Sequence, residues 1–331
     1  MPTITIHLTQ EQIQELYNNR DITVSLDVCN YPSSRFIGST FFDFFDSEIE
    51  RLKENEKKRT SETYTATYKK FLNFTGDKLL PISSLDSKKA EAFQAYLREQ
   101  GLTMNTISFY MRILKAVYNR AVEQGLTIDQ HPFRHVYTGI AKTSKRAISL
   151  EDLRVLKQFH IKNSRLQFAR DMFLFSFYTR GMSFVDMAYL RKADIRNGVL
   201  VYKRHKTGQF ISIQWENKMQ DIVDRYATAT SDYLLPFIHH QNGKERNQYR
   251  NYQSRINHDL KIIAKMAGIG EKLTMYQARH SWATIARQID IPIEVISRGM
   301  GHTNQKTTEI YLKSIDIEVI NQANHRIIEL L

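Results

Sequence analysis

Residues 197–213 read NGVLVYKRHKTGQFISI, and this stretch shapes the expected fold because it interrupts a chain that is otherwise mostly helical in pattern. Its first pair, Asn-Gly, is a strong β-hairpin signal, since both residues readily adopt the left-handed turn conformation. Branched apolar residues then alternate with other residues on both sides of the basic tip KRHKTG, at Val199, Val201, Ile211 and Ile213. The pattern predicts a small three-stranded antiparallel sheet with a basic hairpin tip.

The sequence on either side of this hairpin favours helices. Between residues 40 and 137, apolar residues recur every three or four positions in four segments, as on the buried face of a helix. Gly101 and Gly125 follow two of these segments, at the position where glycine commonly ends a helix. A buried helix is expected near residues 172–178, and helices resume from about residue 217. We therefore expect a mainly α protein with one small antiparallel sheet.

The composition is that of a folded, helical protein. The 331 residues are 42% hydrophobic and 25% charged, and only 13 glycines and 6 prolines are present, which argues against a turn-rich β-sandwich. The single cysteine, Cys29, excludes an internal disulfide framework and a cysteine-based zinc site. Since the chain has no run of eighteen apolar residues and its first residues do not resemble a signal peptide, we expect a cytoplasmic protein without membrane contact.

The charge balance points to a polyanionic partner. Lys and Arg together number 47 against 35 Asp and Glu, which gives a formal net charge of +12. A basic surface attracts nucleic acid, although charge alone is equally compatible with a basic protein that binds none.

The pattern divides the chain into three parts. Residues 1–40 alternate like strands around a short helix signal, and they predict a small β/α unit. Residues 41–140 form the all-helical module. A polar, basic linker begins at residue 141, and residues 141–331 form a mixed α+β domain that contains the hairpin.

Four separated segments of this longer domain carry groups suited to phosphate chemistry. They are Thr179-Arg180-Gly181-Met182-Ser183, His205-Lys206-Thr207-Gly208 at the hairpin tip, Tyr276-Gln277-Ala278-Arg279-His280 at a helix start, and Gly301-His302-Thr303 followed by Tyr311. Each segment alone is more often structural, as a surface cation, a solvated turn or a packed aromatic. In this order and spacing, the segments resemble the tyrosine recombinases, the site-specific recombinases and integrases of phages and mobile elements.

The resemblance spans roughly residues 147–331, and the helical module resembles the family's core DNA-binding domain. It implies that residues 1–40 form an arm-binding or accessory unit. The family pattern is an arginine, a hairpin lysine, His-x-x-Arg, Gly-His, and a tyrosine nine residues beyond that histidine. It is matched in order by Arg180, Lys206, Arg279, His302 and Tyr311. The resemblance implies a C-shaped clamp on double-stranded DNA with specific recombination sites. It also implies an enzyme that cleaves and rejoins strands through a 3′-phosphotyrosine, without metal, ATP or cofactor.

The residue types also fit this chemistry from first principles. Arg180 and Arg279 would stabilise the charge on the two non-bridging phosphate oxygens, because a guanidinium donates forked hydrogen bonds that lysine cannot copy. Tyr311 would attack phosphorus, and Lys206 would protonate the departing 5′-oxygen. His302 would hydrogen-bond the phosphate and exchange a proton with Tyr311.

Two positions depart from the family pattern. Tyr276 stands where the family has the histidine of His-x-x-Arg, and its hydroxyl either replaces one hydrogen bond to the phosphate or its ring packs at the helix start. The segment after Arg180 is three residues longer than the commonest family form, which places the supporting carboxylate at Asp186. Asp186 would hold Arg180 or a neighbour in place. His280 is interpreted as a hydrogen-bonded structural residue beside Arg279.

Candidate DNA contacts come from the helical module and the linker. The module's last helix begins with hydroxyl and amide groups and carries cations, which suits phosphate contacts but also an ordinary capped, solvated helix. The linker contributes further cations. The candidates are Thr103, Asn105, Thr106, Arg112, Lys115, Lys142, Lys145 and Arg146.

Residues 315–331 predict an amphipathic terminal helix. The family resemblance implies that this helix docks on a neighbouring protomer in a synaptic tetramer, and the alternative is that it folds onto its own domain. Two other functions stay open. One is a type IB topoisomerase, which shares the chemistry and relaxes supercoils; the other is a catalytically inactive DNA-binding factor of the same fold.

Overall fold

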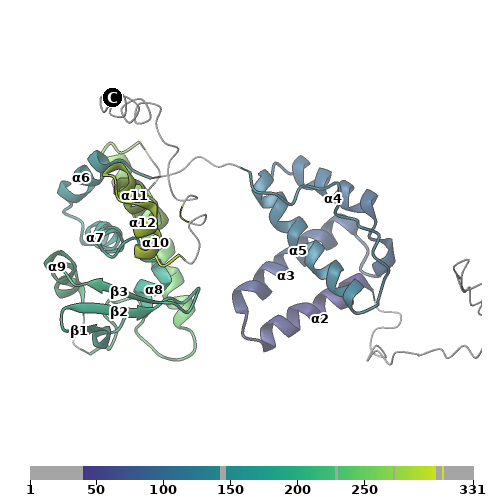
Figure 1. The fold of residues 1–331 in the computed structure, drawn as a ribbon, viewed down its shortest axis with the longest axis horizontal. Helices are drawn as coiled ribbons and strands as arrows, with labels where there is room; N and C mark the ends of the chain where they lie inside the picture. The colour runs from purple at the N-terminus through teal and green to yellow at the C-terminus, as the bar shows by residue number, and fades with distance from the viewer. Residues whose placement is uncertain (1–39, 142–146, 228–229, 271–272, 303–307, 309–331) are drawn as a thin grey trace, which may run out of the picture. The chain divides into compact units, whose positions relative to one another are not determined.

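A computed structural model shows the architecture of the chain (Figure 1). The structure describes residues 40–141, 147–227, 230–270, 273–302 and 308. Contacts divide the chain into two compact units, Met1–Lys142 and Thr143–Leu331. The β/α unit expected at the N-terminus, most of the expected linker and the expected terminal helix lie outside the described residues.

The described part of the first unit is helical. Its elements are α2 (Phe41–Glu54), α3 (Lys58–Thr75), the short 3-10 helix η1 (Ile82–Ser84), α4 (Ser87–Glu99) and α5 (Met104–Glu123). Helices α2, α4 and α5 each begin where a side chain accepts a hydrogen bond from the first turn, at Thr40, Asp86 and Thr103. Four α-helices therefore lie where the four apolar stripes predict them.

Aromatic side chains fill the core of this unit. Phe71 and Phe93 are fully buried, and their rings meet edge to face with centroids 4.9 Å apart. Such a pair adds about 0.5–1.5 kcal/mol beyond the burial of its surface. Among the described residues of this unit, Glu48 is the buried charge, and it pairs with Arg51 at 2.8 Å and Arg120 at 2.9 Å.

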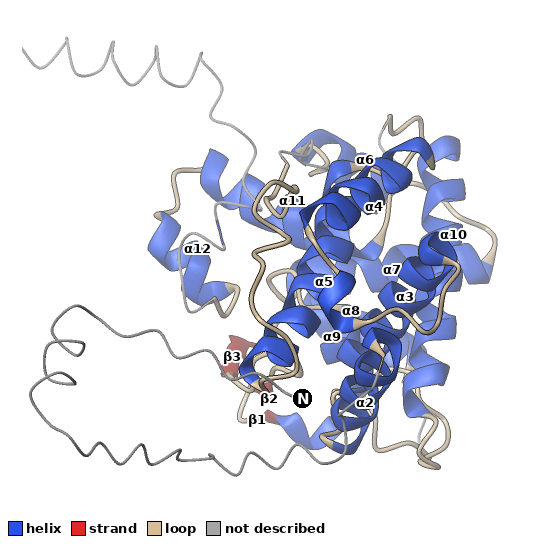
Figure 2. Cartoon of the chain, turned by 90° about the vertical axis from the view of Figure 1, so that its right-hand side faces the viewer, coloured by secondary structure: helices blue, strands red, loops and turns tan. Residues whose placement is uncertain are grey.

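The second unit combines helices with one small sheet, which Figure 2 colours in blue and red. Its helices are α6 (Leu150–Gln158), α7 (Ser164–Tyr178), α8 (Phe184–Tyr189), η2 (Lys192–Asp194), α9 (Asn217–Tyr226), α10 (Glu245–Met266), α11 (Met275–Gln288) and α12 (Ile293–Gly299). Helix α7 is central, because it packs against α6, α9, α10 and α11. It buries residues all around its circumference, as an internal apolar helix does.

The sheet orders its strands β1 (Ile195–Arg196), β2 (Val199–Lys203) and β3 (Phe210–Gln214), and both pairings are antiparallel. Asn197 and Gly198 take the positive φ angles, 50° and 72°, that the hairpin signal predicts. The mainly α fold with a small antiparallel sheet is confirmed.

The buried face of β2 differs from the one that the valine alternation suggested. Leu200 and Tyr202 are buried, whereas Val201 is 41% exposed. The register explains this, because Leu200 pairs with Ile213 and Tyr202 pairs with Ile211, so these four residues share one face. The next residue on that face of β2 is position 204.

Candidate active site

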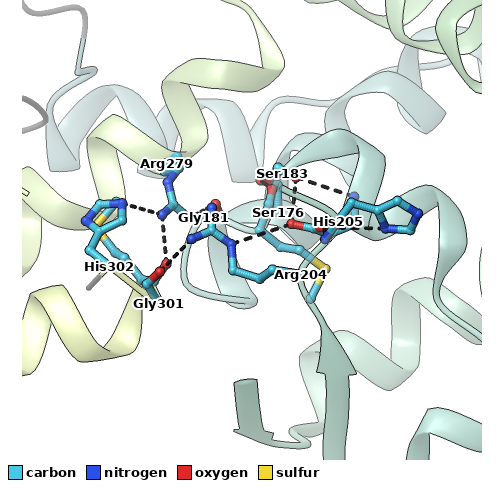
Figure 3. Close-up of polar contacts among 11 residues, drawn as sticks. Ser176, Gly181, Ser183, Arg204, His205, Arg279, Gly301 and His302 are labelled. Atoms are coloured by element: carbon cyan, nitrogen blue, oxygen red, sulfur yellow. Dashed lines mark hydrogen bonds and ion pairs between the residues drawn. The ribbon is translucent and has the colours of Figure 1, made fainter. Parts of the chain in front are cut away.

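Three of the four predicted segments meet inside the second unit, around the turn that follows α12 (Figure 3). Arg279 on α11 is 6% exposed and joins them. Its Nη1 donates to the carbonyl of Gly181 at 2.9 Å, and its Nη2 donates to the carbonyl of Met300 at 2.8 Å. The same Nη2 lies 2.7 Å from Nε2 of His302. Segments about a hundred residues apart in sequence therefore share one guanidinium.

The contacts of His302 define its protonation state. A guanidinium only donates, so Nε2 of His302 accepts from Arg279 and carries no proton. The proton therefore sits on Nδ1, which lies 2.8 Å from the hydroxyl of the buried Thr308. Burial, together with the cations Arg279, Arg204 and Lys206, lowers the pKa of His302 to about 4. The imidazole is neutral at pH 7 and oriented from both sides.

Close packing at Gly181 lets α7 and α11 meet. Its φ of 71° belongs to the left-handed region, and a Cβ there would lie 2.6 Å from Cα of Arg279. The glycine therefore brings its carbonyl within reach of the Arg279 guanidinium, and any side chain at this position would push the two helices apart.

Arg204 is a functional candidate that the sequence reasoning missed. It continues the buried face of β2 and is 8% exposed. Its Nη1 donates to the carbonyl of Gly301 at 2.6 Å, the carbonyl that follows the one bound by Arg279. Figure 3 shows the guanidinium groups of Arg204 and Arg279 beside this turn. The available signal was the two-residue period through Leu200 and Tyr202, which points position 204 inward.

Gly301 allows the hairpin to approach this turn. Its φ is 63°, and a Cβ would lie 2.5 Å from Cδ1 of Ile211 and 3.1 Å from Cδ of Arg204. The Gly-His motif therefore has a steric reason, because the residue before His302 must leave space for both strands of the hairpin.

Asp186 anchors the hairpin. It is 3% exposed and accepts from the hydroxyl of Ser183 at 2.7 Å and from the backbone N–H of His205 at 2.9 Å. Its carboxylate also lies 3.9 Å from Nε of Arg204 and 3.8 Å from Nδ1 of His205. These contacts tie Asp186 to the hairpin and place it beside Arg204, and its role in holding Arg180 or a neighbour stays a prediction.

Arg180 lies near the end of α12 as well, with its Cδ 3.8 Å from where a Cβ of Gly299 would be, but its hydrogen bond differs from those of Arg279. It follows α7 with a φ of 59°, and its Nη1 donates to the carbonyl of Ser212 on the exposed face of β3 at 3.3 Å. Lys206 is exposed at the hairpin tip, and its charge is one of those that lower the pKa of His302. Tyr311 lies outside the described residues.

Tyr276 and His280 lie on α11 one turn apart. Tyr276 is 58% exposed, and its ring meets that of His280 edge-on at a centroid distance of 4.7 Å. His280 is buried, which agrees with its structural interpretation. Tyr276 therefore stays largely exposed to solvent at the helix start.

In the helical module, one of the predicted DNA contacts is already engaged in the fold. The amide of Asn105 donates to the carbonyl of Ala141 at 3.0 Å and accepts from its N–H at 2.8 Å, so this side chain fixes the exit of the chain from the module. Thr103 and Thr106 hydrogen-bond each other at the start of α5, as a helix cap does. The more exposed candidates are Arg112 and Lys115. Lys142, Lys145 and Arg146 lie outside the described residues.

The described residues show no other type of centre. They contain no group of three or more His, Cys, Asp and Glu side chains placed to hold a metal ion. No helix in this part of the chain combines the length and the apolar character needed to cross a membrane.

Comparison with known proteins agrees with this arrangement. A model of the phage integrase SAM-like domain matches residues 40–138, and a model of the phage integrase family matches residues 148–317, more than half of the chain. The tyrosine recombinase XerA of Thermococcus kodakarensis is 24% identical over 281 residues, which cover 82% of this chain and 90% of that protein. A tyrosine recombinase of Thermosipho africanus is 24% identical over 286 residues, covering 84% and 95%.

Solved structures share the fold. The Tn1549 transposon integrase, in complex with a circular intermediate DNA, matches with a TM-score of 0.65 at 17% identity and covers 87% of this chain and 99% of that one. A lambda integrase dimer bound to a core site matches with a TM-score of 0.60 at 15% identity, covering 91% and 85%.

Proposed function

Because the chain belongs to the phage integrase family of tyrosine recombinases, we propose that it cleaves and rejoins DNA with Tyr311 as the nucleophile. As a member of this family the protein is a DNA recombinase. The observation that carries the assignment of its residues is the convergence of Gly181, Arg279 and His302 on one turn, with the basic hairpin packed against the same turn.

The proposed step exchanges one phosphodiester for another. The phenol oxygen of Tyr311 forms a bond to phosphorus, the bond from phosphorus to the 5′-oxygen breaks, and a 3′-phosphotyrosine results. Lys206, at the exposed hairpin tip, gives a proton to the departing 5′-oxygen. A 5′-hydroxyl of another strand then attacks the phosphotyrosine and releases Tyr311, so the energy of the broken bond is conserved.

The state of His302 suits the role of proton acceptor. At pH 7 its imidazole is neutral, and Nε2 bears the lone pair that now accepts from Arg279. When a phosphate oxygen replaces His302 as acceptor of the hydrogen bond from Arg279, the lone pair of Nε2 can accept the proton of Tyr311. The phosphate's negative charge favours the imidazolium that forms, because an opposite charge nearby raises the pKa of a histidine.

Arg279 would stabilise the negative charge that builds on the non-bridging oxygens. It is held by two carbonyls before DNA arrives, so little reorganisation is needed at the moment of reaction. The family pattern nominates Arg180 as the second guanidinium. Tyr276, exposed on the same helix as Arg279, would add a hydroxyl contact to the phosphate.

The two units would share the DNA contacts. Residues 41–140 would form a core DNA-binding domain with Arg112 and Lys115 facing phosphates, and residues 141–331 would form the catalytic domain. Residues 1–40 would serve as an arm-binding or accessory segment. Phosphate contacts of this kind make binding weaken steeply with salt.

We propose that recombination takes place in a synaptic tetramer held by the terminal helix at residues 315–331. A lambda integrase tetramer bound to a Holliday junction shares the fold with a TM-score of 0.60 at 16% identity, which supports this arrangement. Deleting residues 317–331 should leave binding to a single site intact and abolish the pairing of two sites in a gel-shift assay. Unchanged pairing would show that the helix folds onto its own domain.

Covalent capture tests the nucleophile and maps the target sequence in the same experiment. Cells that express the tagged protein are lysed in denaturant, the protein is purified, and DNA that remains attached is sequenced. The parent should retain DNA ending at one short shared sequence, in the presence of EDTA as well, and Tyr311→Phe should retain none. Equal recovery with Tyr311→Phe would overturn the assignment. Relaxation of supercoiled plasmids that lack the mapped site would instead favour a topoisomerase.

A further inference from the structure

We propose that Arg204, the residue that follows β2 in the hairpin, is a catalytic residue that binds a non-bridging oxygen of the scissile phosphate beside Arg279, in the position that the family pattern assigns to Arg180. This inference rests on the proposed function, because it concerns the phosphate that Tyr311 attacks.

The first argument is placement. Arg204 and Arg279 donate to consecutive carbonyls, Gly301 and Met300, and His302 follows directly. Two guanidinium groups thus bind the two carbonyls that directly precede His302. Arg180 donates instead to the carbonyl of Ser212 on β3, and it is not among the cations that lower the pKa of His302.

The second argument is that Arg204 retains capacity for an anion. Its side chain is 8% exposed, and its buried Nε finds no hydrogen-bond partner among the described residues. The carboxylate of Asp186 lies 3.9 Å from Nε, which is beyond hydrogen-bonding distance. A buried cation that is incompletely paired costs free energy, and that cost is recovered when an anion arrives.

The third argument is the electrostatic setting. Arg204 lies close enough to lower the pKa of His302, together with Arg279 and Lys206. Three cations therefore raise the positive potential at one imidazole. A phosphodiester entering there would meet two forked donors, which matches the two non-bridging oxygens that gain charge in the transition state.

Neighbouring contacts also fix the position of the Arg204 side chain beside the turn at Gly301. Asp186 holds the backbone N–H of the next residue, His205, and the ring of His205 stacks on Tyr189 with centroids 4.3 Å apart. Gly301 packs closely on the other side, since a Cβ at this position would lie only 3.1 Å from Cδ of Arg204. The side chain is thus preorganised before DNA binds.

The test compares two nicked suicide substrates built on the mapped site, one with a normal scissile phosphodiester and one with an uncharged methylphosphonate at that position. The methylphosphonate lacks the negative charge that Arg204 would neutralise. On the phosphodiester, Arg204→Ala should form the covalent complex about 10²–10³-fold more slowly than the parent. On the methylphosphonate, Arg204→Ala should form it at a rate matching or exceeding that of the parent.

Three variants complete the experiment. Arg204→Lys keeps the charge and a donor for the Gly301 carbonyl, so it carries the test if Arg204→Ala fails to fold, and it should be slowed on the phosphodiester alone. Arg196→Ala removes an exposed arginine of the same sheet, whose Nε bonds to the carbonyl of Ala193, and should react like the parent on both substrates. Arg180→Lys should slow the phosphodiester reaction less than Arg204→Lys.

Two outcomes would overturn the inference. Parent-like cleavage of the phosphodiester by folded Arg204→Ala would show that the residue is dispensable. Equal slowing or inactivity of the Arg204 variants on both substrates would show that Arg204 only positions the hairpin. Failure of the proposed function is distinguishable, because the parent itself would then form no complex through Tyr311 on the phosphodiester.

Discussion

One buried charge cluster in the helical unit and one in the second unit are paired in different ways. In the helical unit, the buried Glu48 is paired with Arg51 and Arg120 at hydrogen-bonding distance, inside a core of phenylalanine rings. In the second unit, Arg204 and Arg279 are buried beside each other, and the nearest described carboxylate of Arg204 stays at 3.9 Å. The paired carboxylate in the helical unit stabilises the fold, whereas the incompletely paired arginine in the second unit can bind an anion.

The largest effect on folding is expected in the aromatic core. Phe71→Ala should destabilise the helical unit by about 3–5 kcal/mol, because it removes a ring that packs against Phe41, Phe74 and Phe93 and leaves a cavity. Unfolding in urea measures this loss in the free energy of unfolding. Phe210→Ala removes a ring that is 70% exposed on the hairpin and should change stability little. Similar losses of stability in both variants would show that burial of the ring in the helical core does not set its contribution.

Arg279→Lys should mainly affect chemistry. The rate of covalent complex formation should fall by about 10²–10³-fold, equivalent to about 2.7–4 kcal/mol, because lysine cannot reproduce the forked contact. Arg287→Lys, at the exposed end of the same helix, is the matched control. A fall in DNA affinity that accounts for the whole loss of rate would mean that Arg279 binds DNA without acting in the transition state.

Gly301→Ala tests whether the hairpin must touch the turn. A methyl group would lie 2.5 Å from Ile211, at a φ of 63°, so the hairpin has to shift and stability should fall by about 1–3 kcal/mol. Gly125→Ala shares the positive φ but has open space around it, which isolates the steric part. The covalent reaction should slow in Gly301→Ala and not in Gly125→Ala. Equal effects would mean that close packing at the turn is unimportant.

The smallest expected effect is a pH dependence carried by His302. Its pKa is lowered in the folded protein to about 4, so between that pH and its usual value of 6.5 the unfolded chain binds more protons. The stability tied to the neutral imidazole is complete above pH 6.5 and is lost as the pH falls towards 4. The melting temperature of the parent should therefore drop more between pH 7 and pH 5 than that of His302→Gln. Parallel drops would remove His302 as the cause.

Much of the fold could be predicted from local sequence. The apolar stripes of the helical unit, the Asn197-Gly198 turn and the buried helix near residues 172–178 lie where their periods predict them. The face of β2 could not be fixed in this way, because Val201 and Leu200 are both apolar and alternate. Pairing with β3 decided it, since Ile211 and Ile213 bring Leu200 and Tyr202 to the buried side.

Local sequence was also insufficient to identify which residues lie in the candidate active site. An arginine next to lysine and histidine at a hairpin tip looks solvated in sequence, and burial of Arg204 depends on the close approach of Gly301. An asparagine at a helix start suits a phosphate, and only the fold shows that Asn105 holds the backbone of Ala141.

The sequence by itself determined the family, the order of the reactive groups and the helical character, because periodicity and spaced motifs are local properties of the chain. The tertiary structure decided which guanidinium groups are neighbours, since segments about a hundred residues apart meet only through packing at Gly181 and Gly301. It also decided the neutral state of His302, which follows from burial and from cations on α11 and on the β2–β3 hairpin.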